Sequence, residues 1–156
     1  MKSILVGVDG SECSLRALDF AAEEAALRDV PLRIICAWEM PEVAFAVSAY
    51  PEEILTEILA GIQEDARAIV AEAKTRVAEL KPALTVKTKV VKGHPGPMIV
   101  KEAKDAVLVV VGNRGRGGVA SVLLGSVSHH VVHLAPCPVT VVRVAPFHER
   151  ASRCQG

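Results

Sequence analysis

Two kinds of hydrophobic pattern alternate along the chain, and each predicts a different element. Short, nearly continuous apolar runs rich in β-branched residues are typical of strands that are buried on both faces of a parallel sheet. One of these runs carries Lys87 and Lys89 on the same face, which indicates an edge strand. The five predicted strands cover residues 3–9, 31–38, 84–91, 106–112 and 138–144.

Between the strands, apolar residues recur at steps of three and four, the spacing of one helix face. Ser11 or Glu12 begins the first predicted helix, with Ser11 and Ser14 as capping hydroxyls. The second runs from Pro51 to near Leu80. A short third helix passes through Ile99 and Ala103, and a fourth begins near Gly125 and Ser126. The stripe of the second helix is predicted to be Leu55, Ile58, Ile62, Ala66, Ile69, Ala73, Val77 and Leu80.

Strand and helix in strict alternation predict the fold class, an α/β domain with an open five-stranded parallel sheet of Rossmann-like type and helices on both faces. The 156 residues suit one domain, and 51% hydrophobic with 23% charged residues is ordinary for a soluble globular chain. We expect the domain to span residues 1–145. Residues 146–156 lack periodicity and are expected to form a flexible C-terminal tail.

Charge and cysteine usage narrow the function classes. Lysine plus arginine (18) equals aspartate plus glutamate (18), so no basic excess favours nucleic acid or an anionic membrane as a partner. Cys13, Cys36, Cys137 and Cys154 show neither a CxxC pair nor zinc-finger spacing, as in reduced cytosolic proteins. Asp9 interrupts the first apolar run before it reaches signal-peptide length. We therefore expect a soluble cytoplasmic protein.

A glycine-rich segment, "GNRGRGGVASVLLGS" at residues 112–126, follows the most apolar strand. One interpretation is a flexible connector. A P-loop is a second, but the lysine followed by serine or threonine is missing after the glycines. A dinucleotide fingerprint is a third, but "GNRGRG" lacks the required glycine spacing and follows the fourth strand rather than the first.

The spacing inside this segment favours an anion site. Gly112 and Gly115 would let backbone amides turn inward, and Gly125-Ser126 stands at a predicted helix start. Amides in a turn together with a helix N-terminus suit phosphate groups. Arg114 and Arg116 would add positive charge. The residues themselves thus predict a phosphate-binding crevice.

The pattern Gly-x2-Gly-x9-Gly-Ser resembles the ATP-binding motif of the universal stress protein family. The resemblance covers almost the whole chain through "VGVDGSECSLRAL", "CAW", "VVGNRGRGG", "LLGSVS" and "APCPVTVVR". It implies the strand order 3-2-1-4-5, which makes strands one and four neighbours. Open parallel sheets bind ligands at such a switch point, beyond the carboxyl ends of the strands.

The resemblance also implies a nucleotide site. Asp9 would lie near the ribose or a phosphate-bound Mg²⁺ ion, and Ala37 would meet the adenine edge through its backbone. Two departures are Asn113, where many relatives have serine or threonine, and Gly7, where some have proline. The implied nucleotide-binding residues are Gly7, Val8, Asp9, Ala37, Gly112, Asn113, Arg114, Gly115, Arg116, Gly117, Gly118, Gly125, Ser126 and Val127.

By this resemblance, the protein would bind ATP and signal its occupied state to another protein under stress. Two alternatives stay open. One is a slow Mg²⁺-dependent ATPase. The lack of an evident catalytic base argues against it. The other is a dimeric scaffold with a vestigial site, against which stands the intact glycine motif. No residue is assigned a catalytic role.

Two further features concern metal and assembly. His129, His130 and His133 have helical spacing, but no acidic or cysteine ligand is evident nearby, so a surface location is favoured over a metal site. The last strand, 138–144, is β-branched and is protected at its edge only by Pro138 and Arg143. We expect a homodimer that pairs two copies of this strand, as the resemblance also implies.

Overall fold

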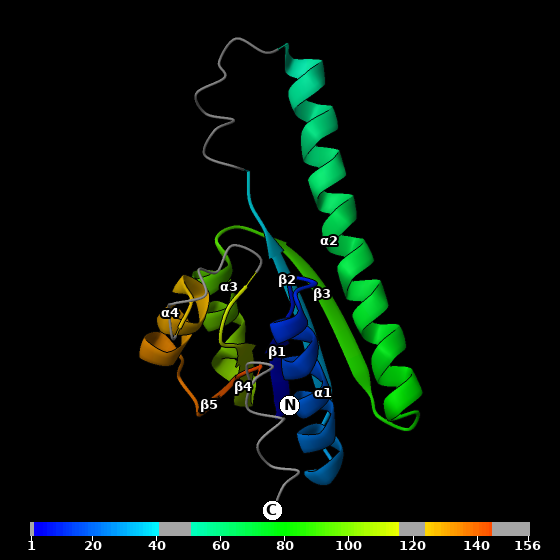
Figure 1. The fold of residues 1–156 in the computed structure, drawn as a ribbon, viewed down its shortest axis with the longest axis vertical. Coiled ribbons are helices and arrows are strands. Elements are labelled where there is room, and N and C mark those ends of the chain that lie inside the picture. The colour runs from blue at the N-terminus through cyan, green and yellow to red at the C-terminus, as the bar shows by residue number, and fades with distance from the viewer. Residues whose placement is uncertain (1, 41–50, 116–123, 145–156) are drawn as a thin grey trace, which may run out of the picture.

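The computed structural model describes residues 2–40, 51–115 and 124–144, and the predicted tail lies outside these ranges. Helices and strands alternate along the chain as predicted (Figure 1). The elements are β1 (Ser3–Gly7), α1 (Glu12–Leu27), β2 (Leu32–Trp38), α2 (Glu52–Leu80), β3 (Val86–Lys92), α3 (Pro95–Glu102), the 3-10 turn η2 (Ala103–Asp105), β4 (Ala106–Gly112), α4 (Ser126–Leu134) and β5 (Val139–Val142).

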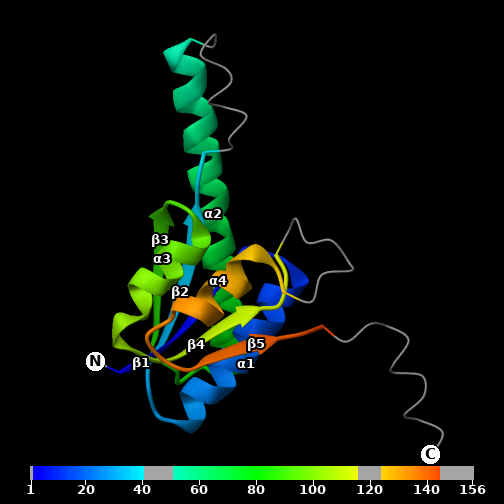
Figure 2. The same cartoon turned by 90° about the vertical axis from the view of Figure 1, so that its left-hand side faces the viewer.

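The five strands form one parallel sheet in the order β3-β2-β1-β4-β5, so the predicted fold is confirmed. Helices α1 and α2 cover one face and α3 and α4 cover the other (Figures 1 and 2). Alternate residues of β1 enter opposite cores: Ile4 and Val6 pack toward α1 and α2, and Leu5 packs toward α3 and α4. This double burial explains why the strands are apolar at almost every position.

The first and last strands are shorter than predicted. β1 ends at Gly7 instead of Asp9, because the Asp9 carboxylate accepts the Ser11 N–H at 2.9 Å and turns the chain into α1. β5 covers only Val139–Val142, because its partner β4 ends at Gly112, which is in register with Val142. The edge position of the third strand, β3, is confirmed, with Lys87 and Lys89 exposed.

Helix α2 follows its predicted apolar stripe only over its second half. Ala66, Val70, Ala73 and Val77 are its buried residues. The prediction is wrong toward the ends, where Ile58 is 45% exposed and Leu80 50% exposed. The helix is longer than the sheet that it covers, so its first turns extend past the sheet (Figure 1). None of the helices in the described ranges is both long and apolar enough to cross a membrane.

Two of the three described cysteines fill gaps between elements, and all three are free thiols. Cys36 is buried within the core under α1 and α2, and Cys137 packs against the core under α3 and α4. Burial raises the pKa of the Cys137 thiol, so this side chain stays protonated at neutral pH. Cys13, by contrast, is only half-buried, and Cys154 lies outside the described residues.

Asp29 is the one described non-glycine residue with a positive φ, 51°, and it follows the last turn of α1. The Val30 N–H donates to the Ala25 carbonyl at 3.1 Å and the Asp29 N–H to the Ala26 carbonyl at 3.3 Å. This is a Schellman motif, in which glycine is favoured at the position of Asp29. We expect Asp29→Gly to raise the free energy of unfolding by about 0.5–1 kcal/mol, measured by urea denaturation.

Asp29→Ala is the matched comparison, since it removes the same carboxylate but retains a Cβ. Its free energy of unfolding should fall about 1 kcal/mol below that of the glycine variant, because alanine also pays the left-handed strain. Equal stability of the two variants would contradict the assignment of strain to this residue.

Candidate functional site

A crevice of about 320 Å³ opens at the carboxyl ends of β1 and β4, the switch point of the sheet. Strands β1, β2 and β4 and the first turns of α1, α3 and α4 all contribute to its walls. The lining residues are Gly7, Val8, Asp9, Ser14, Ile35, Ala37, Pro95, Ile99, Val111, Gly112, Arg114, Gly115, Gly125, Ser126, Val127 and Ser128.

Ten of the residues proposed from the sequence line this one crevice: Gly7, Val8, Asp9, Ala37, Gly112, Arg114, Gly115, Gly125, Ser126 and Val127. Asn113 is not among the lining residues. Its side chain is buried, and its backbone N–H and carbonyl form hydrogen bonds with Val142 and Gly125. Arg116, Gly117 and Gly118 lie outside the described residues. The structure thus brings together the two segments that the sequence separates by about 100 positions.

Asp9 is held in place by the start of α1. Its Oδ1 atom accepts hydrogen bonds from the Ser11 N–H at 2.9 Å and the Ser11 Oγ–H at 2.6 Å. Ser11 is also the N-cap, as predicted, and its Oγ accepts the Ser14 N–H at 3.3 Å. The Asp9 N–H donates in turn to Ser14 Oγ at 3.3 Å. This ring of hydrogen bonds fixes the carboxylate at the crevice wall.

The wall opposite Asp9 is held by hydrogen bonds between the two ends of the glycine-rich segment, near Asn113 and near Gly125. The Gly125 N–H donates to the Asn113 carbonyl at 2.7 Å, and the Ser128 Oγ lies 3.0 Å from the carbonyl oxygens of both Asn113 and Gly125. The Asn113 N–H donates to the Val142 carbonyl at 2.8 Å, and this hydrogen bond connects the same loop to β5. The N-terminus of α4 is therefore held beside the end of β4, where its amides favour an anion.

Gly112 and Gly115 are required by close packing rather than by an unusual backbone conformation. The described glycines with positive φ are Gly10 and Gly93. An ideal Cβ at Gly112 would lie 2.8 Å from the Cys13 carbonyl carbon, and one at Gly115 would lie 2.6 Å from Asp9 Oδ2. Real Cβ atoms do not approach this closely, so a side chain at either position must displace the wall that it meets.

The two ends of the crevice differ in chemistry. On the β2 side, Ile35 and Ala37 face Pro95 and Ile99 of α3, which makes an apolar slot. On the β4 side lie Arg114, with its positive charge, and the start of α4. A ligand with a flat apolar group at one end and an anionic group at the other would satisfy both ends.

Six lining residues were not predicted from the sequence: Ser14, Ile35, Pro95, Ile99, Val111 and Ser128. Ser14 and Ser128 each stand three residues after an N-cap, Ser11 and Gly125, and this spacing is a signal that the sequence contains. Pro95 and Ile99 enter the crevice only because α3 packs on the sheet, and no local pattern marks them.

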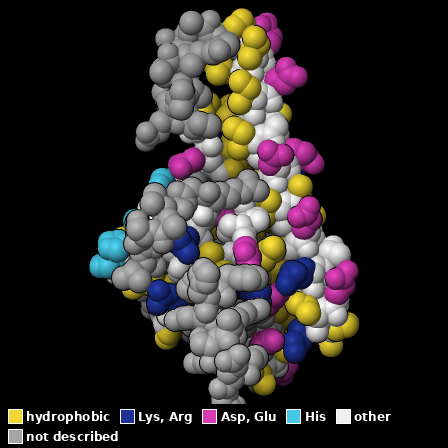
Figure 3. Space-filling view, viewed as in Figure 1, with side chains coloured by type: hydrophobic (Ala, Val, Ile, Leu, Met, Phe, Trp, Pro, Cys, Tyr) yellow, Lys and Arg dark blue, Asp and Glu magenta, His cyan; other side chains and the backbone are white. Residues whose placement is uncertain are grey.

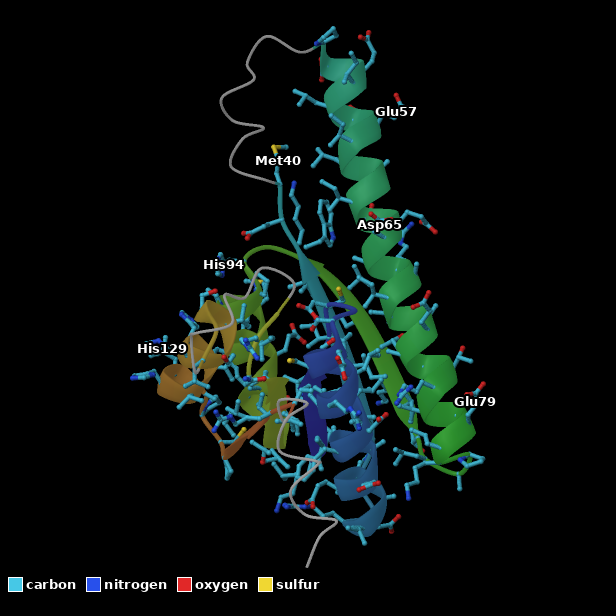
Figure 4. All side chains as sticks on the ribbon, in the orientation of Figure 1. Met40, Glu57, Asp65, Glu79, His94 and His129 are labelled. Carbon is cyan, nitrogen blue, oxygen red and sulfur yellow. The ribbon has the colours of Figure 1, made fainter. Side chains whose placement is uncertain are left out.

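His129 and His133 are exposed on α4, as Figure 4 shows for His129, whereas His130 is half-buried and lies against Gly96 of α3. The rings of His129 and His133 stack with their centroids 4.3 Å apart, and His133 Nδ1 lies 3.0 Å from the His129 carbonyl oxygen. In the described part of the chain, no three histidine, cysteine or acidic residues are arranged to hold a metal ion.

Known relatives are similar in sequence to this chain over most of its length. Universal stress protein Rv2623 of Mycobacterium tuberculosis is 38% identical over 147 residues, which cover 90% of this chain and 44% of that protein. Universal stress protein YxiE of Bacillus subtilis is 34% identical over 146 residues, which cover 90% of this chain and 97% of that protein. The chain thus spans less than half the length of the mycobacterial relative and nearly all of the Bacillus one.

Solved structures agree in fold. A universal stress protein in complex with cAMP has a TM-score of 0.68 at 28% identity and covers 92% of this chain and 98% of its own. The Archaeoglobus fulgidus universal stress protein in complex with dAMP has a TM-score of 0.62 at 25% identity, with 91% and 98% covered. The model of the universal stress protein family matches residues 1–143. This match over most of the chain, together with 34% identity to nearly the whole Bacillus relative, shows that the chain belongs to the universal stress protein family.

Proposed function

We propose that the crevice binds an adenine nucleotide, with ATP as the expected ligand, and that the occupied protein regulates another protein in a stress response. The observation that carries the proposal is the meeting of the glycine segment, the α4 N-terminus and Asp9 at the β1–β4 switch point. The apolar slot at Ile35 and Pro95 would take the base, and the end at Arg114 and Ser126 would take the phosphates. Bound cAMP and dAMP in two family members support an adenine ligand.

A Mg²⁺ ion on the phosphates is compatible with this arrangement. Mg²⁺ commonly uses one or two carboxylates together with substrate phosphates. Among the described residues that line the crevice, Asp9 supplies the carboxylate. In this proposal Asp9 would hold the ion, which would neutralise phosphate charge.

Calorimetric titration with ATP tests the proposal, with GTP as the matched control for the base. We expect micromolar affinity for ATP and much weaker binding of GTP, because the apolar slot would leave the additional polar groups of guanine unpaired. Mass spectrometry of the small molecule that co-purifies with native protein identifies the ligand independently. Absence of binding by every adenine nucleotide (ATP, ADP, AMP and cAMP) would overturn the proposal.

We expect ATP turnover to be well below the roughly 1–100 per second typical of kinases. Among the described lining residues, Asp9 is the one candidate base, and two hydrogen bonds from Ser11 already occupy its Oδ1 atom. A phosphate-release assay on the purified protein measures the rate. Rapid turnover that disappears in Asp9→Ala would instead place the protein among the enzymes.

A further inference from the structure

The first half of α2, residues 52–65, is an extension with no buried side chain. The buried residues of α2 begin at Ala66, where the helix starts to pack on the sheet. Figures 1 and 2 show the earlier turns rising past the ends of the strands. Helix stability in proteins comes mostly from burying an apolar face, so an unburied half of this length needs another reason to be apolar.

An apolar stripe runs along this extension. Ile54 is 40% exposed and Ile58 is 45% exposed, and with Gly61 they follow the i, i+4, i+7 spacing of one helix face. Leu55, Leu59 and Ile62 lie beside them and are half-buried. The space-filling view shows hydrophobic side chains gathered along this end of the molecule (Figure 3). We call Ile54, Ile58 and Gly61 the exposed stripe.

Gly61 has no packing role among the residues that the structure describes. A Cβ at this position would meet none of their atoms within 4 Å. Glycine in a helix interior is less stable than alanine, so the residue weakens α2 without making a contact to the described residues that would offset this loss. A glycine on an exposed helix face does leave a notch, which lets the backbone of a second helix approach closely.

Acidic residues surround the stripe. Residues 52–65 contain Glu52, Glu53, Glu57, Glu64 and Asp65 and no lysine or arginine, and the first basic residue of α2 is Arg67. Glu57 and Asp65 lie along this half of the helix in Figure 4. The rest of the chain has a positive balance, because the complete sequence has equal numbers of basic and acidic residues. In residues 52–65, the apolar exposed stripe is thus bordered by acidic side chains only.

This charge determines which occupant fits. A second copy of α2 would set five carboxylates against five, and an anionic membrane would also be repelled. A helix with lysine or arginine beside an apolar stripe would pair its charges with the border and its apolar face with Ile54 and Ile58. We propose that the first half of α2 docks a basic amphipathic helix of a partner protein.

The site is separate from the nucleotide crevice and from the proposed dimer edge. α2 packs on β2 and β3, whereas β5 forms the opposite edge of the sheet. The exposed stripe on α2 would therefore remain accessible to a partner helix in a dimer that pairs through β5. The proposal stands whether or not the crevice binds ATP.

A synthetic helical peptide of leucine and lysine at amphipathic spacing is the probe, and its affinity is measured by fluorescence anisotropy. The matched control peptide has glutamate at every lysine position. We expect the lysine peptide to bind and the glutamate peptide to bind at least about tenfold more weakly, because like charges would face each other. Double substitution Ile54→Ser and Ile58→Ser should weaken binding of the lysine peptide by a similar factor.

Two further variants separate docking from folding. Leu27→Ser changes a side chain that is 81% exposed at the end of α1, and it should leave peptide binding unchanged. Gly61→Leu should stabilise α2 in thermal unfolding, since the space around Gly61 is open, yet it should block the notch and weaken peptide binding. Equal binding of both peptides, no binding of the lysine peptide, or unchanged binding by the Ile54 and Ile58 variant would each overturn the proposal. So would self-association that the same double substitution abolishes, because the occupant would then be a second copy.

Discussion

Gly115→Val is expected to lower ATP affinity by at least about a hundredfold while the protein remains folded. An ideal Cβ at Gly115 already lies 2.6 Å from Asp9 Oδ2, and two hydrogen bonds from Ser11 hold the Asp9 carboxylate in place. Either the Asp9 carboxylate must turn out of its hydrogen bonds with Ser11 or the loop must move away from β1, and each change disrupts the wall that would hold the phosphates. A loss of well-placed amides and charge of this kind costs several kcal/mol of binding free energy. Calorimetric titration measures the loss.

Gly61→Ala is the matched glycine control, because its new Cβ would meet no atom of the described residues within 4 Å. Its ATP affinity should equal that of the unmodified protein. Thermal unfolding shows whether Gly115→Val is folded, as expected for an exposed loop position. If calorimetry finds ATP affinity unchanged in folded Gly115→Val, the role assigned to the glycine segment is wrong.

Val141→Pro is expected to convert a dimer into a monomer. We propose that the free edge of β5 pairs with the same strand of a second copy about a two-fold axis. On the β4 side, the Val109 N–H donates to the Pro138 carbonyl at 2.9 Å and the Asn113 N–H to the Val142 carbonyl at 2.8 Å. Alternate residues of a strand point their backbone groups to the same side, so the Val141 N–H faces the open edge. Proline removes this donor from the proposed interface.

Thr140→Pro is the matched comparison, because the backbone groups of Thr140 face β4. This variant should lose stability, whereas Val141→Pro should stay folded and lose its partner. Light scattering reports the mass in solution and urea denaturation reports the stability. An unmodified protein that is monomeric at high concentration would exclude pairing through β5.

The apolar patterns alone were enough to determine the described strands and α-helices, though not the 3-10 turn η2. β1 and β4 are apolar at nearly every position because both of their faces are buried, and α1 has its apolar residues at steps of three and four because one face is buried. The Ser11 cap was also predictable, since it depends on residues within three positions. The family resemblance, rather than any local pattern, supplied the strand order that brings Asp9 beside the glycine segment.

The tertiary structure alone decided how these elements meet. The glycine spacing predicted a role for Gly115. Only the fold shows that a side chain at this position would clash with the Asp9 carboxylate. The apolar stripe of α2 continues through Ile58, but only the extent of the sheet leaves that residue exposed. The register of β5 on β4 likewise decides that the Val141 N–H points outward. Local patterns reflect neighbours a few positions away, whereas these features depend on contacts between segments far apart in sequence, which exist only once the helices and strands have packed.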